Sequence, residues 1–326
     1  MVAKQFKLIV SMSAFVFLNG CAIKSAKHQN GTAAQATPKT MIITQPLIIQ
    51  DSKPSVTEPS VAVEPSGQSE VSLEQEKNQS PDVTSNSQAK VLPKFGIIFS
   101  GGGAKAWAHI GVLKEMQKLK WPISSVAGFE WGSAVAALYA MNLSVNEVEW
   151  EMSKLKEFDK WDLFIKAAFN KKMTSDLKIP FVCPSLNVAK QTIYLLNRGQ
   201  LGQLIPFCLG STTLTKPISQ SIGLLNDVPS LAQHLRATGS NRIILINVLA
   251  QYSKRSFTKD YESSDNIQWV ESAALMAKKP AGVDDVIDIN LDDYGLKDLD
   301  KRRDISNKGA DLSSGQLKKL ADKYGL

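Results

Sequence analysis

The chain has 326 residues, of which 43% are hydrophobic and 21% are charged, so it can hold one large globular domain with additional segments. Its formal charge of +7 is spread along the sequence rather than gathered in arginine-rich blocks. Because nucleic-acid binding requires a basic face, this spread argues against a nucleic-acid partner. Attraction to anionic lipid headgroups remains compatible with the charge.

An export signal is predicted for residues 1–20. Lys4 and Lys7 precede an apolar run, residues 8–18, that is too short to span a bilayer as a stable helix. The run ends in Leu-Asn-Gly-Cys, which resembles the bacterial lipobox and implies that Cys21 is lipidated. An ordinary secretory signal, or an anchor that is not cleaved, is the alternative interpretation.

Lipidation of Cys21 would tie the mature chain stably to a lipid membrane, because several acyl chains are buried together. The next residue is Ala22 rather than the aspartate associated with retention at the inner membrane. We therefore expect a lipid-anchored protein of the bacterial cell envelope, held at the outer membrane and facing the periplasm if the source is Gram-negative.

Residues 21–91 are predicted to form a flexible linker that begins at the lipidated cysteine. The segment is rich in Ser, Thr, Gln, Pro and Val, so it buries too little apolar surface to offset its ordering entropy. The locally apolar stretch TMIITQPLIIQ (40–50) is compatible with a strand or a partner-binding segment. The folded domain is predicted over 92–300, followed by a charged, partly helical tail over 301–326.

Two strand–turn–helix units open the folded part. FGIIFSGGGAKAWAHIGVL (95–113) predicts a buried strand, a glycine turn and a helix, and WPISSVAGFEWGSAVAALYA (121–140) repeats the plan. A tight turn with Gly128 and Gly132 at its two ends is the geometry of a nucleophile elbow, where G-x-S-x-G presents a serine above a sheet. Here the central residue is Glu130.

Strands and helices continue to alternate later in the chain. RIILINVL (242–249) predicts a fully buried strand, and a weaker strand is expected at 286–291. Helical patterns cover 230–238 and 266–279. This alternation predicts an α/β domain with a mainly parallel sheet sandwiched by helices.

The cysteines that would remain after processing are Cys183 and Cys208. A disulfide and two buried free thiols are both compatible with their spacing. Neither cysteine lies in a metal-ligand pattern and the chain has three histidines, so we expect no metal site.

The motif SGGGAKAWAHIGVL (100–113), followed by AGFEWGSAVAALYA (127–140), resembles the patatin-like phospholipase family (PNPLA domain), particularly its bacterial branch. The resemblance covers about residues 92–250. It implies a sandwich of helices around a mainly parallel sheet, and a Ser–Asp dyad that hydrolyses acyl esters of lipids without a cofactor.

The glycine loop, Gly101 to Gly103, is the first part of that implied site. Successive backbone N–H groups near a helix N-terminus converge on a point that favours negative charge, where an oxyanion would develop. Gly102 and Gly103 are the expected donors, and Lys105 stands where the family carries Arg or Lys. Ala106 departs from the family's glycine.

Both positions of the dyad are replaced. Glu130 occupies the serine position. In SIGLLNDVP (221–229), which keeps the tail of the family's aspartate segment, Ser221 occupies the aspartate position, and Asp227 is the nearest carboxylate in sequence.

Three large aromatic residues, Trp107, Phe129 and Trp131, replace smaller residues around the elbow. They are candidates for an apolar wall that holds an acyl chain. The favoured interpretation is that they fill the core, because aromatic residues beside a turn usually do so.

The favoured functional hypothesis is a pseudoenzyme that binds a lipid or an envelope protein without hydrolysing it. It predicts that the Glu130 carboxylate turns toward the amides of Gly102 and Gly103, where the helix dipole stabilises it. One alternative is an active lipid acyl hydrolase in which Ser221 is the nucleophile and Glu130 its base. Another is a structural or assembly lipoprotein that uses its surface.

Overall fold

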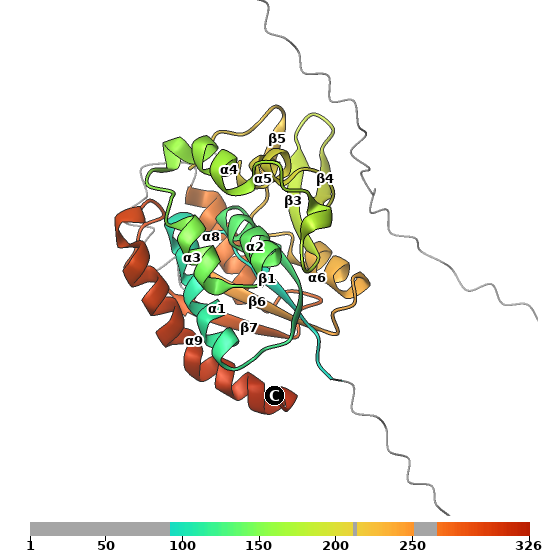
Figure 1. Ribbon diagram of the computed structural model, residues 1–326, viewed down its shortest axis with the longest axis vertical. Helices are drawn as coiled ribbons and strands as arrows, with labels where there is room; N and C mark the ends of the chain where they lie inside the picture. The colour runs from blue at the N-terminus through green and yellow to red at the C-terminus, as the bar shows by residue number, and fades with distance from the viewer. Residues whose placement is uncertain (1–91, 211–213, 251–265) are drawn as a thin grey trace, which may run out of the picture. The chain divides into compact units, whose positions relative to one another are not determined.

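The computed structural model describes residues 92–210, 214–250 and 266–326. The predicted signal peptide, Cys21, the linker and the stretch at 40–50 lie outside these residues. The described part is a seven-stranded sheet with helices on both faces (Figure 1). The predicted fold class is therefore confirmed.

The sheet has the strand order β4-β3-β2-β1-β6-β7, and β5 pairs with β3 beside this path. Strands β1, β2, β3, β6 and β7 run parallel to one another, whereas β4 and β5 run antiparallel to β3. The strands are β1 (Phe95–Phe99), β2 (Ile123–Gly128), β3 (Phe181–Asn187), β4 (Thr192–Leu196), β5 (Ser221–Gly223), β6 (Arg242–Ala250) and β7 (Asp285–Asn290).

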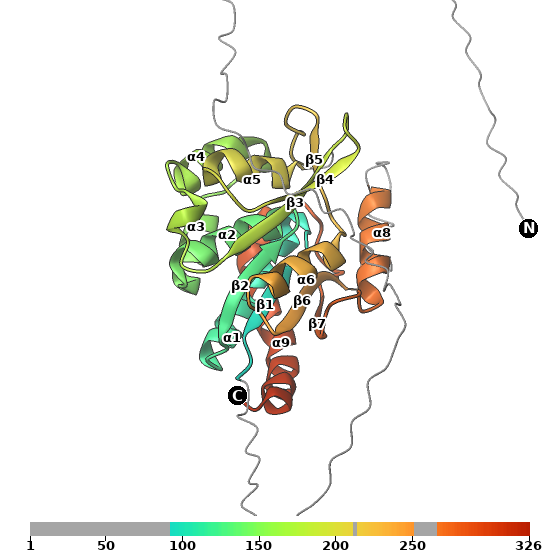
Figure 2. The same ribbon diagram turned by 90° about the vertical axis from the view of Figure 1, so that its right-hand side faces the viewer.

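Helices cover both faces of the sheet, and Figure 2 shows α6 lying over the strands on the face turned toward the viewer. The α-helices are α1 (Ala108–Lys118), α2 (Trp131–Asn142), α3 (Val145–Met152), α4 (Trp161–Phe169), α5 (Leu201–Leu209), α6 (Val228–Ala237), α8 (Asn266–Ala277) and α9 (Arg302–Tyr324). The short 3-10 helices are η1 (Gly103–Trp107), η2 (Phe158–Lys160), η3 (Thr174–Asp176) and η4 (Leu299–Lys301).

The central strands are buried on both faces, which is why their sequences are continuously apolar rather than alternating. In β1, Phe95, Ile97 and Phe99 face the larger hydrophobic cluster, which includes residues of α1, α2 and α9. Ile98 faces the opposite cluster, to which α6 contributes. The two clusters place the core on both sides of β1 and β6.

The last helix, α9, packs on the domain. The prediction that the domain ends at residue 300, before a tail over 301–326, is corrected accordingly. A Cβ added to Gly111 of α1 would lie 1.9 Å from the Ser306 carbonyl oxygen of α9, and one added to Gly309 would lie 2.3 Å from the Ala108 carbonyl oxygen. The two backbones therefore touch, and α9 runs alongside α1 in Figure 1. Small residues make the closest approach, and Ile305 and Leu317 of the same helix are buried in the core.

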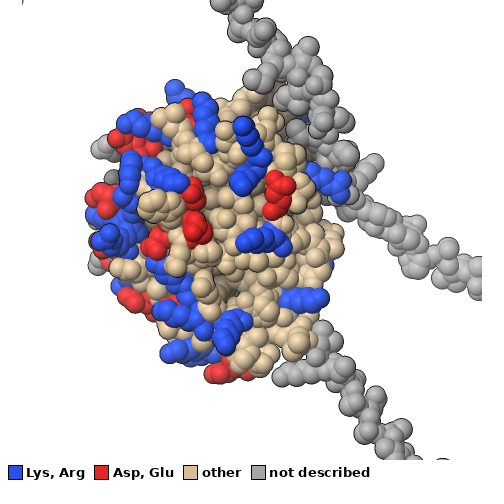
Figure 3. Space-filling model, in the orientation of Figure 1, with Lys and Arg blue, Asp and Glu red and all other residues tan. Residues whose placement is uncertain are grey.

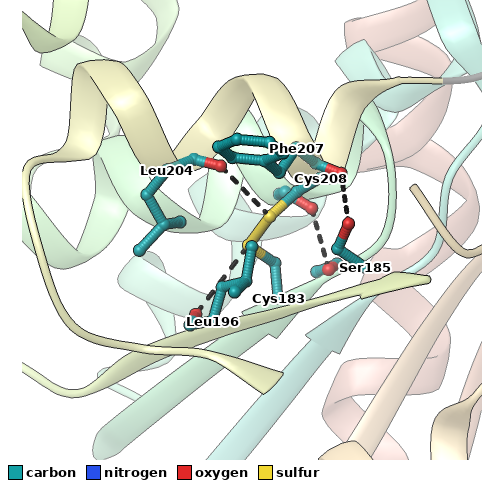
Figure 4. Close-up of a disulfide and its surroundings, with 8 residues drawn as sticks. Cys183, Ser185, Leu196, Leu204, Phe207 and Cys208 are labelled. Carbon is teal, nitrogen blue, oxygen red and sulfur yellow. Dashed lines mark hydrogen bonds between the residues drawn. A yellow bond between two sulfur atoms is a disulfide. The ribbon is translucent and has the colours of Figure 1, made fainter. Parts of the chain in front are cut away.

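Cys183 of β3 and Cys208 of α5 form a disulfide, with a Cα–Cα distance of 6.0 Å, as Figure 4 shows. Of the two alternatives compatible with the sequence, a disulfide and two buried free thiols, the structure has the disulfide. The neighbouring Ser185 Oγ donates to the Phe207 carbonyl oxygen at 2.9 Å. A Cβ added to Gly223 would lie 2.1 Å from the Cys208 carbonyl oxygen, so β5 is packed directly against this crosslink.

Candidate functional site

The elbow lies between the end of β2 and the start of α2, as predicted. Glu130 has φ 45° and ψ −126°, a conformation that is strained for a residue with a side chain. A Cβ added to Gly128 would lie 2.4 Å from the Gly132 carbonyl oxygen, and one added to Gly132 would lie 2.4 Å from the Ser100 carbonyl oxygen. Close backbone approach therefore requires both glycines.

The glycine loop leaves β1 and enters η1. Gly103 has φ 54°, and a Cβ added there would lie 2.3 Å from the Leu296 carbonyl oxygen. That oxygen also accepts a hydrogen bond from the Ala104 amide at 2.7 Å. The loop is thus held by a segment near residue 296 that carries no sequence motif.

The side chain of Glu130 fills the space in front of the loop. Its Oε2 accepts hydrogen bonds from the amides of Gly102 and Gly103, each at 3.1 Å, and the residue is fully buried. The contact predicted between this carboxylate and the two amides is therefore present. Its Oε1 makes no hydrogen bond with any described residue.

Burial raises the pKa of the Glu130 carboxyl to about 7, because a buried charge loses its hydration. The backbone amides of Trp131, Gly102 and Gly103 lower this pKa and offset only part of the effect. Desolvation is the larger influence, so the group changes its charge near neutral pH rather than in acid.

Lys105 is also buried, and its Nζ donates to the Leu291 carbonyl oxygen at 2.9 Å. Leu291 directly follows β7 in the chain. The ammonium group therefore joins the glycine loop region to the end of β7.

The three aromatic candidates are part of the core. Phe129 and Trp131 are fully buried, and Trp107 is 3% exposed. The Trp131 ring lies 5.3 Å from the ring of Phe158 and 5.8 Å from that of Phe164, between centroids. The space that an acyl chain would need beside the elbow is occupied by packed rings, in line with the favoured interpretation.

Ser221 does not join the elbow. It pairs with Asn187 at the edge of the sheet and lines a pocket of about 330 Å³ whose lining includes neither Glu130 nor the glycine loop. No hydrogen bond joins Ser221 to Glu130 in the described ranges. The facing positions that an inverted dyad requires are therefore absent.

The segment that follows Ser221 does reach the site through Leu225, a residue without a sequence motif. A Cβ added to Gly101 would lie 3.2 Å from Leu225 Cδ2 and 3.1 Å from Glu130 Cβ. An isobutyl group and Glu130 thus both lie against Gly101.

Ser100 is a second residue without a predicted role. Its carbonyl oxygen lies 2.8 Å from His109 Nε2, which donates to it, and its Oγ accepts from the Val248 amide at 2.9 Å. Burial lowers the pKa of His109 to about 4, so the imidazole is neutral at neutral pH. Ser100 joins β1, α1 and β6 directly before the glycine loop.

Within the described ranges, no group of His, Cys, Asp and Glu side chains is arranged to hold a metal ion. A helix long and apolar enough to cross a membrane is likewise absent from these ranges.

Comparison with known proteins places these features in a family. The family model described as patatin-like phospholipase matches residues 97–245. The chain is 24% identical over 186 residues to patatin-like phospholipase domain-containing protein 6 of Homo sapiens, a match covering 48% of this chain and 13% of that protein. It is 24% identical over 178 residues to lysophospholipase NTE1 of Pyricularia oryzae, covering 47% of this chain and 12% of that one.

The chain therefore spans about an eighth of the length of these relatives. Among solved structures, VipD from Legionella pneumophila is similar at 12% identity with a TM-score of 0.46, over 69% of this chain and 67% of that chain. Through the domain that contains the glycine loop and the elbow, the chain belongs to the patatin-like phospholipase family.

Proposed function

We propose that the protein is a membrane-anchored patatin-like lipoprotein whose domain binds a lipid or an envelope protein without hydrolysing it. The observation that carries this proposal is the buried carboxyl group of Glu130, whose Oε2 accepts hydrogen bonds from the amides of Gly102 and Gly103. The amides that would stabilise an oxyanion are already occupied by the protein's own side chain.

The chemistry of a carboxylate at the elbow supports the same conclusion. Attack of Glu130 on an ester carbonyl would give an anhydride, and resolving that anhydride needs a base to activate water. The residue nearest to Gly101 on the other side is Leu225, which neither accepts nor donates a proton. Ser133, just past the elbow, donates its hydroxyl to the Gly128 carbonyl oxygen at 2.8 Å, away from the amides.

The test is a phospholipase and short-chain esterase assay on the wild type beside variants that rebuild a dyad. We expect the wild type and the single variant Glu130→Ser to be inactive. Adding Leu225→Asp to Glu130→Ser is the rebuilt dyad that the geometry favours, because Asp and Leu have nearly the same shape. Adding Ser221→Asp to Glu130→Ser instead tests the assignment of Ser221 to the aspartate position, and we expect no activity from this double variant.

Wild-type hydrolysis that Glu130→Ala abolishes would overturn the proposal. Ser133→Ala is the matched control, because it removes a hydroxyl one turn from Glu130 without touching the amides. Circular dichroism of each variant separates loss of folding from loss of activity.

Membrane anchoring rests on the predicted lipidation of Cys21, after the signal over 1–20. The disulfide between Cys183 and Cys208 supports export, because such bonds persist in oxidising compartments such as the periplasm. We expect Cys21→Ser to move the protein from the membrane fraction to the soluble one and to remove acyl chains from its mass spectrum. A wild-type protein without acyl chains would contradict the lipidation of Cys21. It would not affect the outcome of the phospholipase and esterase assay.

A further inference from the structure

A pocket of about 590 Å³ opens between α3 and the start of α9, and Trp107 separates it from Trp131 of the elbow, with 6.3 Å between the two ring centroids. We call it the α3–α9 pocket. Figure 3 shows charged side chains of both signs gathered over this side of the molecule. The pocket is lined by Trp107, Glu149, Ser153, Lys156, Asp300, Arg302, Arg303, Asp304 and Ser306.

Two nearly buried residues form the inner part of this pocket. Trp107 and Ser306 are each 3% exposed. The hydroxyl of Ser306 has no hydrogen-bond partner in the described part of the chain. Because a buried hydroxyl without a hydrogen bond is destabilising, it points to a ligand that completes the hydrogen bond.

Charged side chains line the rest of the pocket, three cationic and three acidic. They are Lys156, Arg302, Arg303, Glu149, Asp300 and Asp304. Glu149 is neutralised by a salt bridge to Lys114 at 2.8 Å, which lies outside the lining. In the described residues the other five charged groups make no salt bridge with one another. Lys156 Nζ donates to the Ser153 carbonyl oxygen at 2.7 Å, and Arg302 Nη1 donates to the Leu299 carbonyl oxygen at 2.9 Å. Each of these cations keeps further N–H donors for a ligand, since an ammonium group has three and a guanidinium group has five.

We propose that the α3–α9 pocket binds a small zwitterion in which a phosphate group is joined to an ammonium group. Guanidinium groups suit phosphate, since they donate two parallel hydrogen bonds to its oxygens, and the Ser306 hydroxyl adds a donor from the floor. The acidic side chains suit the ammonium group. Cationic and acidic side chains in one pocket match a phosphate joined to an ammonium group better than they match a polyanion.

The size of the pocket agrees with a small-molecule site, since such sites occupy roughly 300–1,000 Å³. The ligand has two possible sources, free phosphoethanolamine and the headgroup of phosphatidylethanolamine in a membrane. Neither Glu130 nor any glycine of the loop lines this pocket. The zwitterion proposal can therefore be tested independently of the proposed function.

The experiment is calorimetric titration of the mature chain, purified in a nonionic detergent, with phosphoethanolamine, inorganic phosphate and ethanolamine. We expect phosphoethanolamine to bind at least about tenfold more tightly than either half alone. Arg303→Ala and Ser306→Ala should each weaken it by about tenfold.

Matched controls come from the same helix. Lys308→Ala removes an exposed cation outside the lining, and Ser313→Ala removes a buried hydroxyl that already donates to the Ala310 carbonyl oxygen. Both should leave binding unchanged. Binding of phosphate as tight as that of the zwitterion, no binding at about 10 mM, or insensitivity to Arg303→Ala would each overturn the proposal.

Vesicles distinguish the two sources once binding is established. Competition by phosphatidylethanolamine vesicles, but not by vesicles of phosphatidylglycerol alone, supports the site and assigns it to the headgroup. Absence of competition supports the site for the free zwitterion.

Discussion

The two segments in which the family resemblance predicts a dyad, the elbow half and the β5 half, differ in their geometry. The elbow half keeps its geometry although its residue has changed, with Glu130 held at φ 45° and its carboxyl against the glycine-loop amides. In the β5 half, Ser221 lies at the sheet edge, and Leu225 lies beside Gly101.

The difference between the two halves follows from the contacts that stabilise each of them. At the elbow, Gly128 and Gly132 sit against backbone atoms at distances that a Cβ would not allow. The β5 half depends on a disulfide, with Gly223 packed on Cys208. Backbone packing requires these glycines whether or not chemistry occurs, so the glycine pattern alone is no sign of hydrolysis.

The largest effect should come from breaking the elbow. Gly132→Ala places a Cβ 2.4 Å from the Ser100 carbonyl oxygen, so we expect a loss of about 4 kcal/mol or more in the free energy of unfolding. Gly315→Ala on α9 is the matched control, because no atom lies within 4 Å of its new Cβ. It should stabilise by about 0.5–1 kcal/mol in urea titration. Equal changes in the free energy of unfolding for Gly132→Ala and Gly315→Ala would show that the elbow is not tightly packed.

Removing the disulfide should weaken the β5 half. Cys183 and Cys208 are 25 residues apart, so on the chain-entropy model replacing both with alanine should lower the free energy of unfolding by about 3.5 kcal/mol. Hydrogen exchange should rise in β5 and α5 more than in β1 and β2. Uniform loss of protection would mean that the two halves are not held independently.

A comparable change should appear in the pH dependence of stability. The pKa of Glu130 is raised to about 7 from 4.5, so its contribution to stability is greatest below pH 4.5 and is lost as pH rises through 7. Glu130→Gln does not titrate. Relative to the wild type, we expect this variant to gain on the order of 3 kcal/mol between pH 4.5 and pH 8.

His109 acts in the opposite direction. Its pKa is lowered to about 4, so its contribution is present above pH 6.5 and is lost as pH falls through 4. In the wild type the two residues oppose each other between pH 4.5 and 6.5. The variant Glu130→Gln should therefore lose stability on acidification where the wild type stays nearly level. Parallel pH profiles would contradict the burial of Glu130.

The smallest effect should come from Ser221→Ala. This residue is half-buried and its side chain makes no hydrogen bond among the described residues. We expect the free energy of unfolding to change by less than about 0.5 kcal/mol. A loss of more than about 1.5 kcal/mol would reveal a contact that keeps the β5 half in place.

Much of the fold could be predicted from the sequence because short-range patterns encode it. The runs at 95–99 and 242–249 are apolar throughout, and glycines mark the turns that follow β1 and β2. The contact of Glu130 with the loop also followed from these patterns. Leu225, Leu296 and the packing of α9 did not, because they meet the site or the core only through tertiary contacts between distant segments.

The most direct test of the central claim is the pKa of the Glu130 carboxyl, measured by carbon NMR on protein labelled at glutamate and assigned with Glu130→Gln. Burial against the amides of Gly102 and Gly103 predicts a value of about 7. A value near 4.5 would place the carboxylate in water, leave the glycine-loop amides open, and contradict the account.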